Sequence, residues 1–226
     1  MKLSLFSLAS LVPFAAAHFR LVYPTARERV EDKMSIFPCG GSPSTERTKV
    51  SISNGSFPVA LNMGHAETAV EMLLALGSDP GSNFNITLVP TFGLLGLGSF
   101  CLPEVSFDTS VLGVKVEDGM NATLQVQTNG DPSGGLYACA DIQFSSTATD
   151  NDPSSCKNNS GITASPFSGS SMKLNANEST AEGEPQSGSS SGGHGGHGDH
   201  GSSAASLQTA TWGMLGAAVV GAVAML

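Results

Sequence analysis

Short segments in which apolar residues recur at the period of a strand occupy the middle of the chain. Five of them are predicted strands: residues 69–74, 85–89, 113–116, 122–127 and 136–144. The second is expected to end at Pro90, and Pro-Gly, Asp-Gly and Asn-Gly pairs separate the others. No long stretch shows a helical period with caps. The pattern therefore predicts an all-β domain built as a β-sandwich.

The limits of this domain follow from changes in composition. Residues 25–48 are rich in polar residues and proline and are expected to form a long irregular loop. The folded domain is predicted to span residues 18–160, which is near the usual domain size of about 100–150 residues. Residues 161–202 are dominated by Ser, Gly, Asn, Thr and Glu, with isolated apolar residues. Such a segment buries too little surface to fold and is predicted to be a disordered stalk.

The beginning of the chain has the pattern of a secretory signal peptide. Met1 and Lys2 precede an apolar run from Leu3 to Ala16, and Ala15–Ala17 forms an Ala-x-Ala cleavage site. Residues 1–17 are therefore predicted to be removed. His18 would then begin the mature chain, with a free α-amine beside its imidazole.

The end of the chain has the pattern of a GPI-attachment signal. Residues 212–226 are apolar but fall short of the about 20 residues that a membrane span needs. Small residues at 201–205 and a short spacer precede them. We expect lipid attachment near Ser202 and removal of residues 203–226. The alternative is a weak tail anchor, which the missing basic flank disfavours.

Charge and cysteine content narrow the class of protein. The mature chain would hold nineteen acidic and nine basic residues, a net charge of −10, which argues against a nucleic-acid partner. Four cysteines in a secreted chain imply two disulfides, with three possible connectivities. The N-glycosylation sequons are at Asn54, Asn85, Asn121, Asn158 and Asn177.

Two histidines in the folded domain form a candidate metal site. His18 would supply an amine and an imidazole, and His65, which precedes a predicted strand, would supply a second imidazole. Three nitrogens in this T-shaped set, called a histidine brace, suit Cu(II). The alternative to this metal site is that His65 is an ordinary loop histidine. The remaining histidines, His194, His197 and His200, lie in the stalk, where they form either a weak second metal site or low-complexity sequence.

A third ligand is expected from the strand at 136–144. Its alternation places Tyr137, Cys139 and Asp141 on one face, which the cysteine is expected to bury. A buried carboxylate without a partner is costly, and copper would provide that partner. The alternative is a salt bridge to Arg20 or to another base.

These features together resemble fungal copper-binding proteins that look like lytic polysaccharide monooxygenases and are grouped with the copper acquisition factors. The resemblance covers residues 18–156. It rests on His18, Gly64-His65, the strand from Tyr137 to Ile142, the four cysteines and the GPI-like tail. It implies an immunoglobulin- or fibronectin-like sandwich with one copper ion on His18, His65 and Asp141. It also implies the disulfides Cys39–Cys139 and Cys101–Cys156.

Two classes of function compete. A polysaccharide-cleaving copper oxidase needs a face that docks a polymer, but the mature domain would hold only Tyr23 and Tyr137 and no tryptophan. A carboxylate ligand also favours Cu(II) over Cu(I). A GPI-anchored copper carrier at the outer face of the plasma membrane, serving a copper importer, is therefore favoured. A cell-wall protein that contacts glycan, with an incidental brace, is the third alternative.

Overall fold

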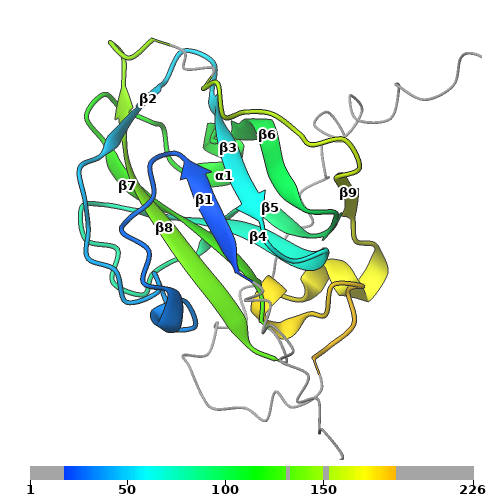
Figure 1. The fold of residues 1–226 in the computed structure, drawn as a ribbon. Coiled ribbons are helices and arrows are strands. Elements are labelled where there is room, and N and C mark those ends of the chain that lie inside the picture. The colour runs from blue at the N-terminus through cyan, green and yellow to red at the C-terminus, as the bar shows by residue number, and fades with distance from the viewer. Residues whose placement is uncertain (1–17, 131–132, 150–152, 187–226) are drawn as a thin grey trace, which may run out of the picture. The chain divides into compact units, whose positions relative to one another are not determined.

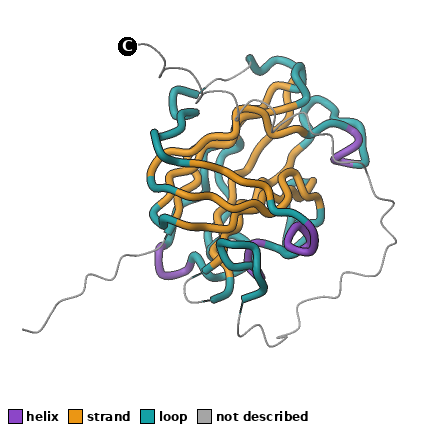
Figure 2. The backbone as a smooth tube through the Cα atoms, turned by 90° about the vertical axis from the view of Figure 1, so that its right-hand side faces the viewer, coloured by secondary structure: helices purple, strands orange, loops and turns teal. Residues whose placement is uncertain are grey.

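A computed structural model describes residues 18–130, 133–149 and 153–186 of the chain (Figure 1). Strands and their connecting loops make up most of this part, and the helices are short (Figure 2). No helix within these ranges is long and apolar enough to cross a membrane. The predicted signal peptide (1–17), GPI signal (203–226) and stalk histidines lie outside the described residues and stay predictions.

Two sheets form the domain, which confirms the all-β prediction. The three-stranded sheet has the order β1-β3-β6, with β1 at Phe19–Tyr23, β3 at Ser56–Met63 and β6 at Gly98–Ser106. The six-stranded sheet has the order β2-β8-β7-β4-β5-β9. Its members are β2 (Thr48–Ser51), β4 (Glu67–Leu76), β5 (Ile86–Leu95), β7 (Asn121–Asn129), β8 (Gly135–Ser145) and β9 (Thr163–Pro166). Pairing is antiparallel except between β2 and β8.

Four short helical segments complete the described part of the chain. They are η1 (Glu31–Lys33), α1 (Thr109–Leu112), η2 (Gly169–Lys173) and η3 (Ala176–Glu178). The Asp108 carboxylate caps α1 by accepting from the Ser110 and Val111 N–H groups, and Gly113 ends it with a φ of 70°.

The core lies between the sheets and is rich in phenylalanine. Phe92 on β5 meets Phe100 on β6 with ring centroids 6.0 Å apart, and both rings are fully buried. Phe144 on β8 packs on Phe107, with ring centroids 4.8 Å apart. Burying such side chains stabilises the fold by about 1.5–3 kcal/mol each.

Three of the five predicted strands are confirmed, and two need correction. Residues 69–74, 122–127 and 136–144 lie within β4, β7 and β8. The segment 85–89 does not end at Pro90 but continues to Leu95, because Pro90 and Thr91 form a bulge opposite Glu71. Residues 113–116 are not a strand but an irregular segment that begins with Gly113, the glycine that ends α1.

The long loop of residues 25–47, which is irregular apart from η1 as expected, covers the part of the outer face of the six-stranded sheet that includes Cys139 and Asp141. On β8, Tyr137, Cys139 and Asp141 share this face, as their alternation predicted. The Cys39–Cys139 disulfide ties the loop to β8, with 5.1 Å between the Cα atoms. The second predicted disulfide, Cys101–Cys156, is also present.

Residues 161–186 form part of the domain and not the disordered stalk that their composition predicted. β9 pairs with β5, from Phe92–Pro166 to Leu95–Thr163. The segment from 169 to 186, here called the strap, then crosses the sheet near β4, β5, β7 and β8. The Thr91 hydroxyl donates to the Leu174 carbonyl, and Ala176 is fully buried. The folded domain therefore extends beyond the predicted boundary at residue 160, as far as residue 186.

Candidate metal site

His18 and His65 come to the same end of the domain through the pairing of β1 with β3. In this antiparallel pair, Phe19 is opposite Met63 and Arg20 is opposite Asn62. His18 directly precedes β1, and His65 follows the end of β3 by two residues. Opposite residues in such a pair are about 4.5–5.5 Å apart. The two histidines that the sequence paired therefore lie at the same end of the β1–β3 pair.

His65 is held in the turn between β3 and β4 by its own imidazole. Its Nδ1 lies 2.6 Å from the Glu67 carbonyl oxygen. Because a carbonyl only accepts, Nδ1 is the donor in this contact. Metal-binding histidines commonly have this arrangement, in which one ring nitrogen donates to the protein and the other ligates.

The imidazole of His18 has a buried nitrogen without a partner. Nδ1 of His18 makes no hydrogen bond to any residue in the described ranges, although it is shielded from solvent and the residue is half-buried. A buried polar nitrogen left unpaired is costly, so an external partner at this position would stabilise it. The donor set of two imidazoles therefore fits a transition-metal ion such as copper.

The turn that carries His65 rests on the hairpin between β5 and β6. The Gly96 N–H donates to the Ala66 carbonyl at 2.7 Å, directly beside His65. Gly96 has a φ of 113°, and a Cβ added there would lie 2.6 Å from the Gly161 carbonyl oxygen. Only glycine fits this position without strain. The hairpin also exposes two large apolar side chains, Leu95 and Leu97.

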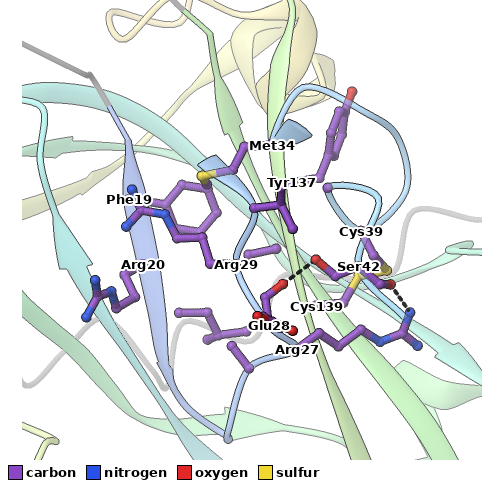
Figure 3. Close-up of a pocket in the computed structure, with 15 residues that line it drawn as sticks. Phe19, Arg20, Arg27, Glu28, Arg29, Met34, Cys39, Ser42, Tyr137 and Cys139 are labelled. Carbon is purple, nitrogen blue, oxygen red and sulfur yellow. Dashed lines mark hydrogen bonds between the residues drawn. A yellow bond between two sulfur atoms is a disulfide. The ribbon is translucent and has the colours of Figure 1, made fainter. Parts of the chain in front are cut away.

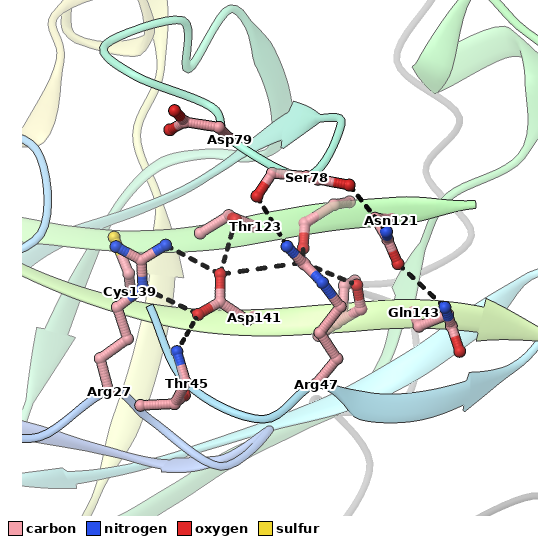
Figure 4. A network of polar contacts seen from close by, with 12 residues as sticks. Arg27, Thr45, Arg47, Ser78, Asp79, Asn121, Thr123, Cys139, Asp141 and Gln143 are labelled. Carbon is pink, nitrogen blue, oxygen red and sulfur yellow. Dashed lines mark hydrogen bonds and ion pairs between the residues drawn. The ribbon is translucent and has the colours of Figure 1, made fainter. Parts of the chain in front are cut away.

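Asp141 is the centre of a buried polar network with arginine (Figure 4). Its carboxylate accepts from Arg27 Nη2 at 2.8 Å and from Arg27 Nε at 3.0 Å, a bidentate pair. The Thr45 N–H and the Thr123 hydroxyl also donate to it, at 2.8 and 2.9 Å, and Arg47 Nη1 lies 3.8 Å away. The structure thus forms the salt bridge named above as the alternative, with Arg27 in the place of Arg20.

This network fixes the ionisation state of Asp141. Burial acts to raise the pKa of its carboxyl, but the hydrogen bonds from Arg27, Thr45 and Thr123 hold the pKa below its ordinary value. The side chain of Asp141 is completely buried, and that of Arg27 is 10% exposed. The cost of burying the carboxylate, which motivated its assignment to copper, is therefore offset within the protein.

Asp141 is also remote from the histidine end of the domain. It is level with Ala75 through Thr123, whereas His65 adjoins Glu67 at the other end of β4. From Glu67 to Ala75 an extended strand spans about 26 Å, at about 3.3 Å per residue. No group of three or more His, Cys, Asp or Glu side chains suited to a metal ion occurs in the described ranges. The structure thus brings His18 and His65 together without Asp141.

A small cavity separates the start of β1 from the loop and β8 (Figure 3). Phe19, Met34 and Tyr137 line it together with the arginine-bearing segment 26–30. Its volume of about 30 Å³ admits roughly two water molecules. It has no room for a sugar ring.

Sequence reasoning missed the residues that satisfy Asp141. Arg27 and Thr45 lie in the irregular loop, where no periodicity shows which side chains face the sheet. The one available signal was the presence of several arginines in the long polar loop.

The described residues thus define a disulfide-bonded, two-sheet domain of the extracellular kind, with two histidines at one end. A family model described as "Copper acquisition factor BIM1-like" matches residues 16–161. The chain therefore belongs to the BIM1-like copper acquisition factor family.

Several curated proteins are similar to this chain. An uncharacterised protein of Aspergillus fumigatus is 62% identical over the full length of both chains. A lytic polysaccharide monooxygenase-like protein X325 of Yarrowia lipolytica is 33% identical, over 84% of this chain and 70% of its own. Copper acquisition factor BIM1 of Cryptococcus neoformans is 34% identical, over 57% of this chain and 60% of its own.

Proposed function

We propose that this protein binds one Cu(II) ion outside the cell and takes part in copper acquisition. The ligands are the α-amine and imidazole of His18, freed by removal of residues 1–17, and the imidazole of His65. The observation that supports the proposal is the β1–β3 register, in which Phe19 pairs with Met63, so that the residue before β1 and the turn after β3 lie at the same end. Family membership supports copper as the metal.

The residues around the histidines have separate tasks in this proposal. The Glu67 carbonyl accepts from His65 Nδ1 and so orients the ring, and Nε2 is the nitrogen proposed to bind copper. The Gly96–Ala66 hydrogen bond holds the turn in place. The bound copper would supply a Lewis-acidic and redox-active centre. The salt bridge of Asp141 with Arg27 gives the domain stability and takes no part in holding the ion.

We propose a carrier and not a polysaccharide-cleaving enzyme. Tyr137 is 7% exposed, and its hydroxyl accepts from Asn177, so its ring offers no stacking platform. The β5–β6 hairpin beside the His65 turn exposes Leu95 and Leu97, which are aliphatic. Flat sugar rings stack on aromatic side chains, whereas aliphatic ones suit contact with a protein.

We further propose that the domain is tethered to the outer face of the plasma membrane by a GPI anchor near Ser202. A tethered carrier would pass copper to an importer in the same membrane and would lie close to cell-wall glycan. The sequence of residues 201–226 supports the anchor. Release of the protein from cells by a phosphatidylinositol-specific phospholipase would test it.

The decisive experiment compares two forms of the protein, one that begins at His18 and one that retains a single alanine before it. A free amine is required for the chelate ring, so the extended form should bind Cu(II) at least about tenfold more weakly, or about 1.4 kcal/mol. Titration calorimetry and the EPR spectrum of the bound ion measure this. Equal affinities and spectra for the two forms would show that copper does not use the α-amine.

A further inference from the structure

The five sequons lie in different environments, and three of them allow a clear comparison. Asn54 is exposed in the turn before β3, and Asn85 is exposed directly before β5. Neither side chain makes a hydrogen bond in the described part of the structure. Asn177 is half-buried in η3, on the strap. Of the other two, Asn121 donates to Ser78, and Asn158 accepts from the Cys101 N–H.

Asn54 and Asn85 lie at the end of the domain opposite His65. β3 begins near Asn54 and ends at Met63, two residues before His65. β5 begins after Asn85 and ends at Leu95, which pairs with Glu67 beside His65. Glycans on these two residues would therefore stand away from the histidines.

Asn177, on the strap, lies toward the histidine end of the domain. Its side chain packs against the start of β8, beside Gly135 and Tyr137. Its Nδ2 donates to the Tyr137 hydroxyl at 3.1 Å, and its Oδ1 is shielded from solvent. A Cβ added to Gly135 would lie 2.5 Å from the Asn177 Cβ, so the two backbones are close. A bulky glycan on Nδ2 has no space in this contact.

The residues on both sides of Asn177 prevent it from turning outward while the strap is bound. Ala176 and Ser179 are fully buried. The Ala176 N–H donates to the Glu71 carboxylate at 3.0 Å, and the Gln186 N–H donates to the Glu178 carbonyl at 2.9 Å. Exposing the amide of Asn177 would require these contacts to break.

We propose that Asn54 and Asn85 carry N-glycans and that Asn177 does not, because a glycan there and the bound strap exclude each other. In the modification, the Asn Nδ2 loses a proton and bonds to C1 of an oligosaccharide. The lipid pyrophosphate that carried the oligosaccharide leaves. The end of the domain that bears His18 and His65 thus stays free of glycan at Asn177.

The full chain, secreted from a eukaryotic host, provides the test. Peptide N-glycosidase in heavy-oxygen water converts each glycosylated Asn to labelled Asp, which peptide mass spectrometry locates. We expect the label at Asn54 and Asn85 and none at Asn177. Asn54→Gln and Asn85→Gln should each lower the intact mass by one glycan, and Asn177→Gln by none. The label at Asn177 in folded protein, or its absence from Asn54 or Asn85, would overturn the proposal.

A matched variant separates the effect of the fold from the strength of the sequon. Glu178→Gly turns Asn177-Glu-Ser into Asn177-Gly-Ser, the same tripeptide as Asn54-Gly-Ser. Glu178 is exposed, and its backbone contact survives the change. If the strap excludes the glycan, Asn177 in this variant stays unlabelled in protein that melts like the wild type. Labelling of Asn177 to the level of Asn54 would attribute the difference to the tripeptide and refute the proposal.

Discussion

Replacing Asp141 with asparagine separates a structural role of this carboxylate from a role as a copper ligand. Asparagine preserves the shape of the side chain but removes its charge. Arg27, whose side chain is 10% exposed, would lose its bidentate partner, and Arg47, 19% exposed, would lose a nearby counter-charge. The Thr45 N–H and Thr123 hydroxyl would compete for a weaker acceptor.

The expected loss of stability follows from these contacts. Removing one partner of a buried ion pair costs about 3–5 kcal/mol, and the partial exposure of the arginines places this pair near the lower limit. A domain of this size loses about 2–4 °C of melting temperature per kcal/mol. Asp141→Asn should therefore lower the melting temperature by roughly 6–12 °C.

The assay combines melting with copper titration. Circular dichroism gives the melting temperature, with Asp32→Asn as a control, because Asp32 is exposed in η1 and should leave it unchanged. Calorimetry with Cu(II), well below the melting temperature, should show an affinity within about threefold of the wild type. Because the pKa of Asp141 is lowered in the folded protein, Asp141 contributes to stability above the unfolded pKa of about 3.9. This contribution is lost as the pH falls through the pKa of Asp141 in the folded protein.

The opposite pair of results would refute this reasoning. An unchanged melting temperature together with a loss of copper affinity of tenfold or more would mean that Asp141 leaves Arg27 to bind the metal. Asp141 would then be the third ligand that the resemblance implied, and the fold would have to rearrange on binding.

Three further predictions concern other parts of the chain. Burial raises the pKa of the Glu71 carboxyl. The contribution of Glu71 to stability is therefore full below the unfolded pKa of about 4.3, and it is lost as the pH rises through the pKa of Glu71 in the folded protein. Glu71→Gln should flatten the dependence of the melting temperature on pH between about 4 and 8, and a slope like that of the wild type would contradict this. Gly96→Ala should destabilise the domain by about 1–3 kcal/mol in urea and weaken copper binding by shifting the His65 turn; wild-type values of both would show that the turn does not depend on the hairpin. The copper-loaded domain should release no oxidised oligosaccharides from cellulose, chitin or xylan with a reductant, and copper-dependent products abolished by His65→Ala would make it an enzyme.

The sequence predicted those features of the fold that depend on the alternation of side chains along a strand and on the pairing of cysteines. Alternation placed Tyr137, Cys139 and Asp141 on one face of β8, and the structure agrees. The resemblance supplied the correct disulfides. The proximity of His18 and His65 depends on the pairing of β1 with β3, and neither strand was predicted, so only the types of residue signalled it.

The strap could not be predicted, because it folds onto the sheet without a hydrophobic pattern of its own. Its contacts are few and specific, such as the Ala176 N–H to Glu71, Thr91 to Leu174, and Gln186 to Gly134. Composition averages over such contacts and therefore indicated disorder. The bulge at Pro90 and Thr91 was also not predicted. A proline normally ends a strand, and nothing in the sequence pattern shows that here the strand continues past an unpaired bulge.

The two buried carboxylates show where the argument from burial to metal fails. Asp141 and Glu71 both lie on the outer face of the six-stranded sheet, and both are nearly inaccessible to solvent. Asp141 faces a loop that carries arginines, so it ionises readily and has a lowered pKa. Glu71 is covered by the strap, where its partners are the neutral Gln127 amide and the Ala176 N–H, and burial raises its pKa. Burial thus predicts that a carboxylate has a partner, and the charge of the segment that covers it decides which partner. A metal ion is required only where that segment supplies neither a cation nor enough donors, and neither carboxylate is in that position.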